Sequence, residues 1–272
     1  MKLSLKTGII AGILTIVITF TGYHSLAGHS LSTERHEWYF EKRGGEQPPV
    51  TDRKFYSLME KYGTIFIGDT SKKEIYLTFD NGYENGYTDD VLNVLREKKV
   101  PAAFFVTGQF MKTDPDLIKR MADEGHIVGN HTFHHPDMTS ISKERLKTEL
   151  QKVKSRYQEI TGKSEMMYVR PPKGVFSENS VAFSKEQGYT HVFWSLAFPD
   201  WDTNRQRGWQ YSYNQIMKQI HPGAILLLHT VSKDNSDALS KVIDDVRKRG
   251  YQFKSLDELA ASQQTPAIFI SP

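Results

Sequence analysis

Short and almost continuous apolar runs alternate with amphipathic segments through most of this 272-residue chain, and no other feature constrains its fold as strongly. Runs such as AAFFV (102–106) and AILLL (224–228) lack the in–out polarity of a half-exposed strand, which indicates strands buried on both faces. Strands that alternate with helices form a mainly parallel sheet covered by helices. We therefore expect an α/β fold. An open doubly wound sheet and a closed barrel share this pattern, and spacing alone does not choose between them.

The same patterns place the individual elements. Seven strands are predicted, at residues 74–79, 102–106, 126–130, 166–170, 190–194, 224–228 and 251–255. Helices are predicted at residues 54–61, 88–97, 116–123, 143–160, 178–187, 213–219, 237–249 and 256–261. We divide the chain into an N-terminal signal or anchor (1–27), a polar, aromatic-studded arm (28–73), one α/β domain (74–261) and a tail (262–272).

The amino terminus has the pattern of a secretory signal peptide. Lys2 and Lys6 precede an apolar stretch at residues 8–20, and Ser25 and Ala27 are small residues suited to a cleavage site. An uncleaved membrane anchor is the alternative, although the stretch is slightly shorter than the roughly 20 residues of a spanning helix. In either case we expect the rest of the chain outside the cytoplasmic membrane, secreted or at the cell envelope. Contact with the membrane is then expected only through an uncleaved N-terminal segment.

Composition excludes several classes of site and partner. The chain has no cysteine, which excludes disulfides, thiolate nucleophiles and Cys-ligated zinc. Its formal net charge is only +3, and Lys2 and Lys6 supply two of these charges. A basic footprint for nucleic acid is therefore missing, and we expect no nucleic-acid partner. We expect a monomer.

Polar side chains, most of them ionisable, collect at the carboxyl ends of the predicted strands, which meet at one rim in both candidate folds. They are Asp80, Asn81, His131, His135, Arg170, Asp200 and His229. Each has an ordinary structural explanation when taken alone: an Asp after a strand often caps the next helix, and a His after an apolar strand is often a buried, hydrogen-bonded residue. Delivered by five strands to one rim, they indicate a site.

Two histidines in the HTFHH segment suggest a metal site. His131 and His135 lie four residues apart, and on a helical turn this spacing brings two imidazoles to one face, where they can bind a divalent metal. The alternative is a pair of surface histidines in a loop. His134 is expected to point away from the other two.

Five motifs occur in the order and spacing typical of one enzyme family. They are TFDNG (78–82), HTFHH (131–135), RPPKG (170–174), the Asp200-Trp201 step and LLLH (226–229). Over about residues 74–259 the chain resembles the polysaccharide deacetylases, the NodB-homology domains of carbohydrate esterase family 4. The resemblance implies an irregular (β/α) barrel of seven strands. Within the family the chain looks most like the PdaA-type N-acetylmuramic acid deacetylases of the muramic δ-lactam pathway.

The resemblance also implies roles for single residues. Asp80 matches the general base, Arg170 the residue that orients it, His229 the general acid and Asp200 the carboxylate that tunes this acid. His131 and His135 match metal ligands. The residues that match or suggest substrate contacts are Lys173, Gly174, Trp201, Leu227 and Tyr83. Trp209 and Tyr211 are further candidates for the groove.

Asn81 departs from the family pattern, which usually has an aspartate there as a third metal ligand. An amide oxygen supplies less negative charge than a carboxylate, so we predict weaker binding of the divalent metal, with zinc as the first expectation and other divalent cations open. The aromatic residue usual before the motif glycine is Lys173 here, so we expect a different groove wall.

The expected function is metal-assisted hydrolytic N-deacetylation of peptidoglycan amino sugars, with glycan strands as the binding partner. The preference for N-acetylmuramic acid, during spore-cortex δ-lactam formation, comes from the resemblance. Two alternatives remain: a deacetylase of the same fold acting on chitin oligomers, N-acetylglucosamine or a small amide, and a non-catalytic glycan-binding module. Asn81 favours the module, whereas the presence of Asp80, Arg170 and His229 opposes it.

Overall fold

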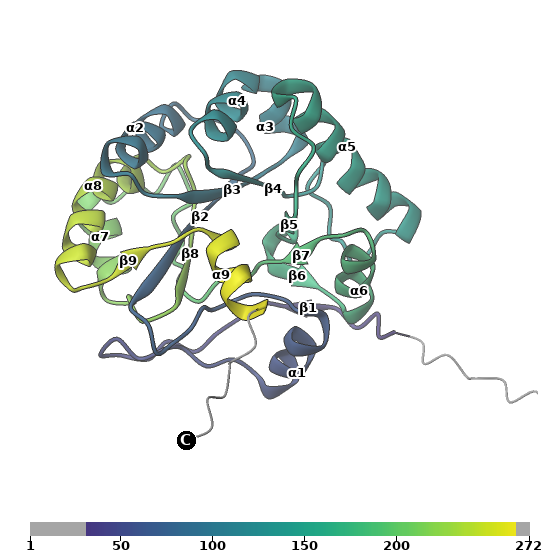
Figure 1. Ribbon diagram of the computed structural model, residues 1–272, viewed down its shortest axis with the longest axis horizontal. Coiled ribbons are helices and arrows are strands. Elements are labelled where there is room, and N and C mark those ends of the chain that lie inside the picture. The colour runs from purple at the N-terminus through teal and green to yellow at the C-terminus, as the bar shows by residue number, and fades with distance from the viewer. Residues whose placement is uncertain (1–30, 265–272) are drawn as a thin grey trace, which may run out of the picture. The chain divides into compact units, whose positions relative to one another are not determined.

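A computed structural model describes residues 31–264, so the predicted signal or anchor and the end of the tail lie outside the described residues. Its main strands are β2 (Glu74–Asn81), β3 (Ala102–Val106), β4 (Ile127–Asn130), β5 (Tyr168–Val169), β7 (Thr190–His191), β8 (Ala224–Leu228) and β9 (Gln252–Phe253). They form one seven-stranded sheet in the order β7-β5-β4-β3-β2-β8, with β9 also paired to β2 (Figure 1). Every pairing in this sheet is parallel. All seven predicted strands are therefore confirmed.

The sheet curls into an irregular barrel. Beyond β7 the chain continues to Leu196, which forms a parallel bridge with Leu226 of β8 and so links the two ends of the strand order. The fold is thus the barrel that the family resemblance implied, and not an open doubly wound sheet. Every residue of β3 and β8 is buried, as their unbroken apolar sequences predicted.

Alternation along β2 determines where its last residues point, because successive side chains of a strand face opposite sides of a sheet. Ile75, Leu77 and Phe79 belong to the main core between the sheet and the helices. Tyr76 belongs to a second cluster, which fills the inside of the curled sheet together with Phe105. Asp80 lies four residues after Tyr76 and therefore faces the same side of the sheet, which places it at the inner rim of the barrel.

Helices surround the sheet (Figure 1). They are α1 (Arg53–Tyr62), α2 (Thr88–Lys98), α3 (Gly108–Thr113), α4 (Pro115–Asp123), α5 (Lys143–Thr161), α6 (Glu178–Glu186), α7 (Trp209–Met217), α8 (Lys233–Lys248) and α9 (Leu256–Gln264), with a short 3-10 turn η1 (Pro172–Gly174). The eight predicted helices are all present, whereas α3 and η1 were not predicted. The start of α8 at residue 237 was wrong, because the Ser232 side chain accepts a hydrogen bond from Asn235 N and caps the helix earlier.

The described part of the arm contacts the barrel. Strand β1 (His36–Glu37) pairs antiparallel with β6 (Val175–Phe176), directly after η1. Trp38 and Phe55 are buried in one aromatic cluster with Phe176. The arm therefore packs against the strand that directly follows the RPPKG segment. The predicted domain limits stay predictions.

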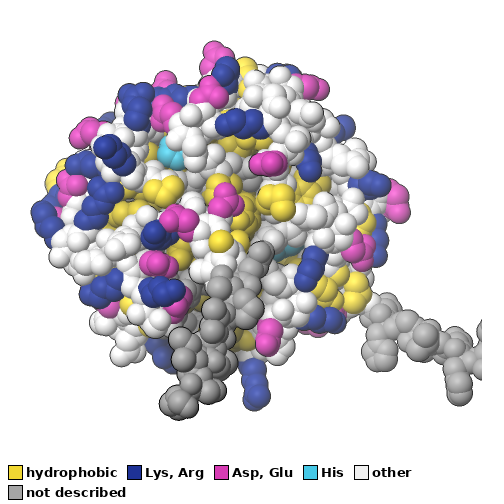
Figure 2. Space-filling model, in the orientation of Figure 1, with side chains coloured by type: hydrophobic (Ala, Val, Ile, Leu, Met, Phe, Trp, Pro, Cys, Tyr) yellow, Lys and Arg dark blue, Asp and Glu magenta, His cyan; other side chains and the backbone are white. Residues whose placement is uncertain are grey.

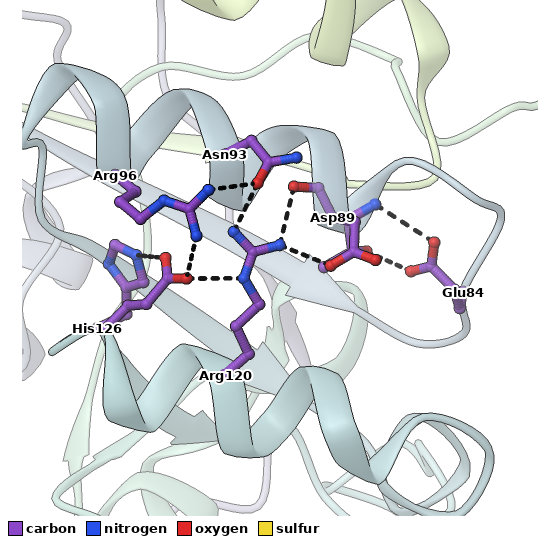
Figure 3. A network of polar contacts seen from close by, with 8 residues as sticks. Glu84, Asp89, Asn93, Arg96, Arg120 and His126 are labelled. Atoms are coloured by element: carbon purple, nitrogen blue, oxygen red, sulfur yellow. Dashed lines mark hydrogen bonds and ion pairs between the residues drawn. The ribbon is translucent and has the colours of Figure 1, made fainter.

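Polar contacts outside the barrel join neighbouring helices. Figure 3 shows Arg120 of α4 between Glu124, which directly follows this helix, and Asp89 and Asn93 of α2. On the face shown in Figure 2, Lys and Arg side chains are interspersed with Asp and Glu, without a patch of a single sign. Among residues 31–264, no helix has the length and apolar character needed to cross a membrane.

Candidate active site

The carboxylate of Asp80 is held by a buried arginine. Arg170 Nη1 donates to Asp80 Oδ1 at 2.8 Å, and the Arg170 side chain has no exposed surface. Its Nε and Nη2 donate to the carbonyl oxygens of Val192 and Phe193, and its guanidinium lies 4.2 Å from the centre of the Phe105 ring. Burial alone would raise the pKa of Asp80, but the positive charge and the hydrogen bond of Arg170 outweigh it and lower the pKa below its usual value. Asp80 is therefore an ionised carboxylate at neutral pH.

His131 and His135 lie beside this carboxylate with their rings close together. The ring centroids are 4.9 Å apart, and His131 Nε2 is 3.6 Å from Asp80 Oδ2. His131 Nδ1 lies 2.8 Å from the Arg170 carbonyl oxygen, which can only accept, so the ring proton is on Nδ1 and the Nε2 lone pair is free. Burial lowers the pKa of both imidazoles, that of His135 to about 4, which keeps both neutral. Neutral imidazoles with a free ring nitrogen are good metal ligands.

The predicted helical turn under these histidines was wrong. Residues 131–135 form a loop in which Thr132 and His135 have φ of 62° and 56°. These two left-handed residues fold the loop back, and this conformation brings the rings together. The alternative of two surface histidines is wrong for His131, whose side chain is only 3% exposed, whereas His135 does lie at the surface. His134 points elsewhere, as expected, and contacts Glu149 of α5.

His229 forms a second pair, with Asp200. His229 Nδ1 lies 2.8 Å from Asp200 Oδ1, and the His229 backbone N–H donates to Asp200 Oδ2 at 2.9 Å. Asn235 Nδ2, in the first turn of α8, also donates to Asp200 Oδ2. Burial lowers the pKa of His229, but the charge and hydrogen bond of Asp200 outweigh it and raise the pKa above its usual value. His229 is thereby favoured as an imidazolium with Nε2–H free to donate. The charges of His229 and Asp80 also act on one another's pKa.

Asn81 is fully buried behind Asp80. Its Nδ2 donates to Thr230 Oγ1 at 2.6 Å, whereas its Oδ1 is buried without a hydrogen-bond partner. Within the described chain, no group of three His, Asp or Glu side chains is arranged to hold a metal ion. Neutral imidazoles and an unpaired amide oxygen are nevertheless donor types that suit a divalent cation.

The predicted substrate residues have different environments. Tyr83 and Trp201 are 47% and 60% exposed, whereas Leu227 is buried in β8. Lys173 has φ of 58°, and Gly174 has φ of 69° with the Trp194 ring 2.7 Å from where a Cβ would lie. Gly174 is therefore required by both backbone conformation and packing.

Trp209 and Tyr211, the further candidates for the groove, lie next to the hydrophobic core. Both are partly buried and pack against the main core.

Several polar residues of the site were not predicted from the sequence. Asn235 contacts Asp200, and Thr230 contacts Asn81 and Thr88. Ser232 was the available signal for Asn235, because a serine cap at this position begins α8 early enough to include it. Nothing in the local pattern distinguishes Thr230 from an ordinary loop threonine.

Comparison with known proteins agrees with the site. The family model described as polysaccharide deacetylase matches residues 67–192. The chain is 53% identical to the peptidoglycan-N-acetylmuramic acid deacetylase PdaA of Bacillus subtilis, covering 82% of this chain and 84% of that protein. It is 30% identical to a peptidoglycan-N-acetylglucosamine deacetylase of Bacillus cereus, covering 75% and 74%. The solved structure of Bacillus subtilis PdaA, a family 4 carbohydrate esterase, superposes with a TM-score of 0.85 at 51% identity, covering 86% of this chain and all of that one. The chain therefore belongs to the polysaccharide deacetylase family.

Proposed function

We propose that this protein hydrolyses the N-acetyl amide of peptidoglycan amino sugars. The observation that carries the proposal is the pair of opposed groups at one rim: Asp80, kept ionised by Arg170, and His229, kept protonated by Asp200. Hydrolysis of an amide needs both a base for the attacking water and an acid for the departing amine. Both relatives described above are named as peptidoglycan deacetylases, which supports this substrate class.

Asp80 acts as the general base. Its Oδ1 is engaged by Arg170, so Oδ2 is the oxygen available to take a proton from water. Because Arg170 is itself fixed by two backbone carbonyl groups, the carboxylate is held in one orientation. A fixed carboxylate loses little free energy to reorganisation when the water is deprotonated.

His229 acts as the general acid. Its Nδ1 is bound to Asp200, so the proton delivered to the leaving nitrogen comes from Nε2. The raised pKa keeps this proton in place at neutral pH. Once the proton has been transferred, the amine leaves as a neutral group and the C–N bond breaks.

His131, His135 and the Asn81 amide oxygen would hold a divalent cation, with zinc the first candidate. When bound, such a cation polarises the acetyl carbonyl and lowers the pKa of water. Charge that develops on the carbonyl oxygen is also met by the backbone N–H of Lys173. The left-handed conformation of that residue sets the direction of its peptide.

We assign the substrate as N-acetylmuramic acid in glycan strands, in the spore-cortex δ-lactam pathway. The higher identity to the muramic acid deacetylase than to the glucosamine deacetylase supports this choice. Exposed aromatic faces at Tyr83 and Trp201 suit the apolar faces of sugar rings, and Leu227 suits the acetyl methyl group. A peptidoglycan substrate and the N-terminal signal pattern both favour action outside the cytoplasmic membrane.

Mass spectrometry of glycan fragments after incubation with the enzyme tests the proposal. Peptidoglycan, glycan strands freed of peptide stems and chitin oligomers are supplied separately, and released acetate is measured alongside. We expect acetate from the peptidoglycan substrates, with the lost acetyl group on muramic acid. Loss from glucosamine alone would reassign the sugar. Binding of glycan without any acetate release would identify a non-catalytic module.

A further inference from the structure

Asn81 belongs to a buried chain of hydrogen bonds that ends at a surface carboxylate. Asn81 Nδ2 lies 2.6 Å from Thr230 Oγ1, and Thr230 Oγ1 lies 2.8 Å from Thr88 Oγ1. Thr88 Oγ1 in turn donates to Glu84 Oε2. Asn81, Thr88 and Thr230 are all fully buried, so no water competes for their bonds. We call Glu84, Thr88 and Thr230 the relay.

The carboxylate of Glu84 determines the direction of every bond in the relay. An ionised carboxylate can only accept, so the single hydroxyl proton of Thr88 points to Glu84. Thr230 must then donate its own proton to Thr88. Because Thr230 Oγ1 has no further proton, it can only accept a hydrogen bond from Asn81. The group of Asn81 that faces Thr230 must therefore be the NH2 group. The amide oxygen is left as the free end of Asn81, and it is indeed the atom without a hydrogen-bond partner.

Glu84 is itself well held at the start of α2. Its Oε1 accepts from the backbone N–H of Gly86 at 2.6 Å and of Thr88 at 3.3 Å. Figure 3 shows Glu84 beside the first turn of α2, near Asp89. Unpaired N–H groups at a helix N-terminus stabilise a negative charge there.

The direction of the amide matters because its two ends differ in chemistry. An amide oxygen can ligate a divalent cation, whereas an amide nitrogen that keeps both protons has no lone pair to offer. We infer that Glu84, acting through Thr88 and Thr230, orients the Asn81 amide so that its oxygen is offered to the cation held by His131 and His135. The inference rests on the cation site of the proposed function. Glu84, Thr88 and Thr230 are positioning residues, since none of them touches the reacting atoms.

A carboxylate at position 81 provides the decisive control. Both oxygens of an aspartate are acceptors that can ligate a cation. Asp in place of Asn81 therefore offers an oxygen in either orientation and does not need the relay to orient it. Loss of the relay should therefore weaken cation binding only when residue 81 is an amide. A merely structural hydroxyl at residue 230 would have the same effect in both backgrounds.

Titration of the purified chain with Zn²⁺ alone, followed by calorimetry, tests the inference without reference to turnover. Thr230→Val keeps the shape of the side chain and should weaken Zn²⁺ binding by about 10- to 100-fold, whereas Thr230→Ser should bind like the wild type. In the Asn81→Asp background, Thr230→Val should cause no such loss, because the Thr230 proton is already given to Thr88 and the carboxylate has no bond to Thr230 to lose. Equal losses in both backgrounds would overturn the inference.

A surface variant covers the case in which Thr230→Val does not fold. Glu84→Gln can donate as well as accept, so it removes the fixed direction of the relay, and we expect a weakening in the same sense of about tenfold or less. Asp90→Asn is the matched control, because it also removes one negative charge near the start of α2. Among the described residues, the Asp90 carboxylate takes part in no hydrogen bond or ion pair. Unchanged affinity in Glu84→Gln would contradict the inference.

A wild-type chain that binds no Zn²⁺ would also overturn it. Acetate release from glycan is measured separately, so such a result would leave the proposed function to its own test.

Discussion

Two carboxylate–cation pairs form the opposite sides of the site, and in each pair the more buried partner holds the residue for which we propose a catalytic role. In the first pair the Arg170 side chain is 0% exposed and the Asp80 side chain 9%. In the second pair Asp200 is 1% exposed and His229 21%. The chemical order is reversed between them: a buried cation holds a reactive carboxylate in one, and a buried carboxylate holds a reactive imidazole in the other. Burial, and not the type of charge, therefore distinguishes the positioning residue from the catalytic residue.

Removing the reactive carboxylate should have the largest effect on turnover. Asp80→Asn keeps the size of the side chain and an oxygen that can accept from Arg170, but it cannot take a proton. We expect acetate release to fall by about 10²- to 10⁴-fold. The fold should be retained with a smaller loss of stability than in Arg170→Met below, because the amide oxygen still accepts from Arg170 but no longer balances its buried charge. Rates and melting temperatures measured on the same preparations check this. Substantial residual turnover would mean that another group is the base.

Removing the buried cation should instead affect the fold. Arg170→Met leaves the Asp80 carboxylate buried without a partner, which costs about 3–5 kcal/mol of unfolding free energy. Urea denaturation measures this loss. Arg120→Met is the matched control, because Arg120 pairs with Asp89 and Glu124 in the more exposed network of α2 and α4. About 1 kcal/mol or less is expected there. Similar losses in the two variants would mean that burial does not separate these arginines.

In the second pair, the positioning group can be altered without touching the reactive one. Asp200→Asn removes the charge that raises the pKa of His229, so this pKa should fall. The acid must be protonated to work, and its activity is lost as pH rises through its pKa. The alkaline limb of the pH–rate profile should therefore move to lower pH, with about a 10- to 100-fold loss of rate at pH 8. A uniform loss at every pH would show that Asp200 acts only on the structure.

The sequence predicted the side chains of both pairs better than it predicted their supports. Asp80 and His229 follow strands whose apolar runs are unambiguous, and the parallel topology then brings their strand ends to one rim. The residues that hold these pairs come from less regular segments. Asn235 contacts Asp200 only because Ser232 caps α8 early enough to include Asn235 in the helix. Thr230, in the loop after β8, contacts Asn81 at the end of the neighbouring strand β2.

Conformations that depend on tertiary contacts were also beyond the local pattern. Spacing suggested a helical turn for His131 and His135, whereas two left-handed residues in a loop bring the rings together. The pairing of β1 with β6 joins residues more than a hundred positions apart, and two-residue strands carry no detectable alternation.

The smallest effect is expected outside both pairs, at the exposed residue next to Asp200. Trp201 is 60% exposed, and its indole N–H forms no hydrogen bond within the described residues, so Trp201→Ala should not disturb the fold or the pKa of His229. If the ring packs on the glycan, KM should rise by about two- to tenfold with kcat unchanged, because the contact is the same in the ground and transition states.

Met167→Ala serves as the control: Met167 is 56% exposed but precedes β5, at the opposite end of the strands. A fall in kcat for Trp201→Ala would instead mean that the exposed ring helps to position Asp200, so that Trp201 acts together with the second pair. Unchanged kinetics would remove Trp201 from the substrate groove.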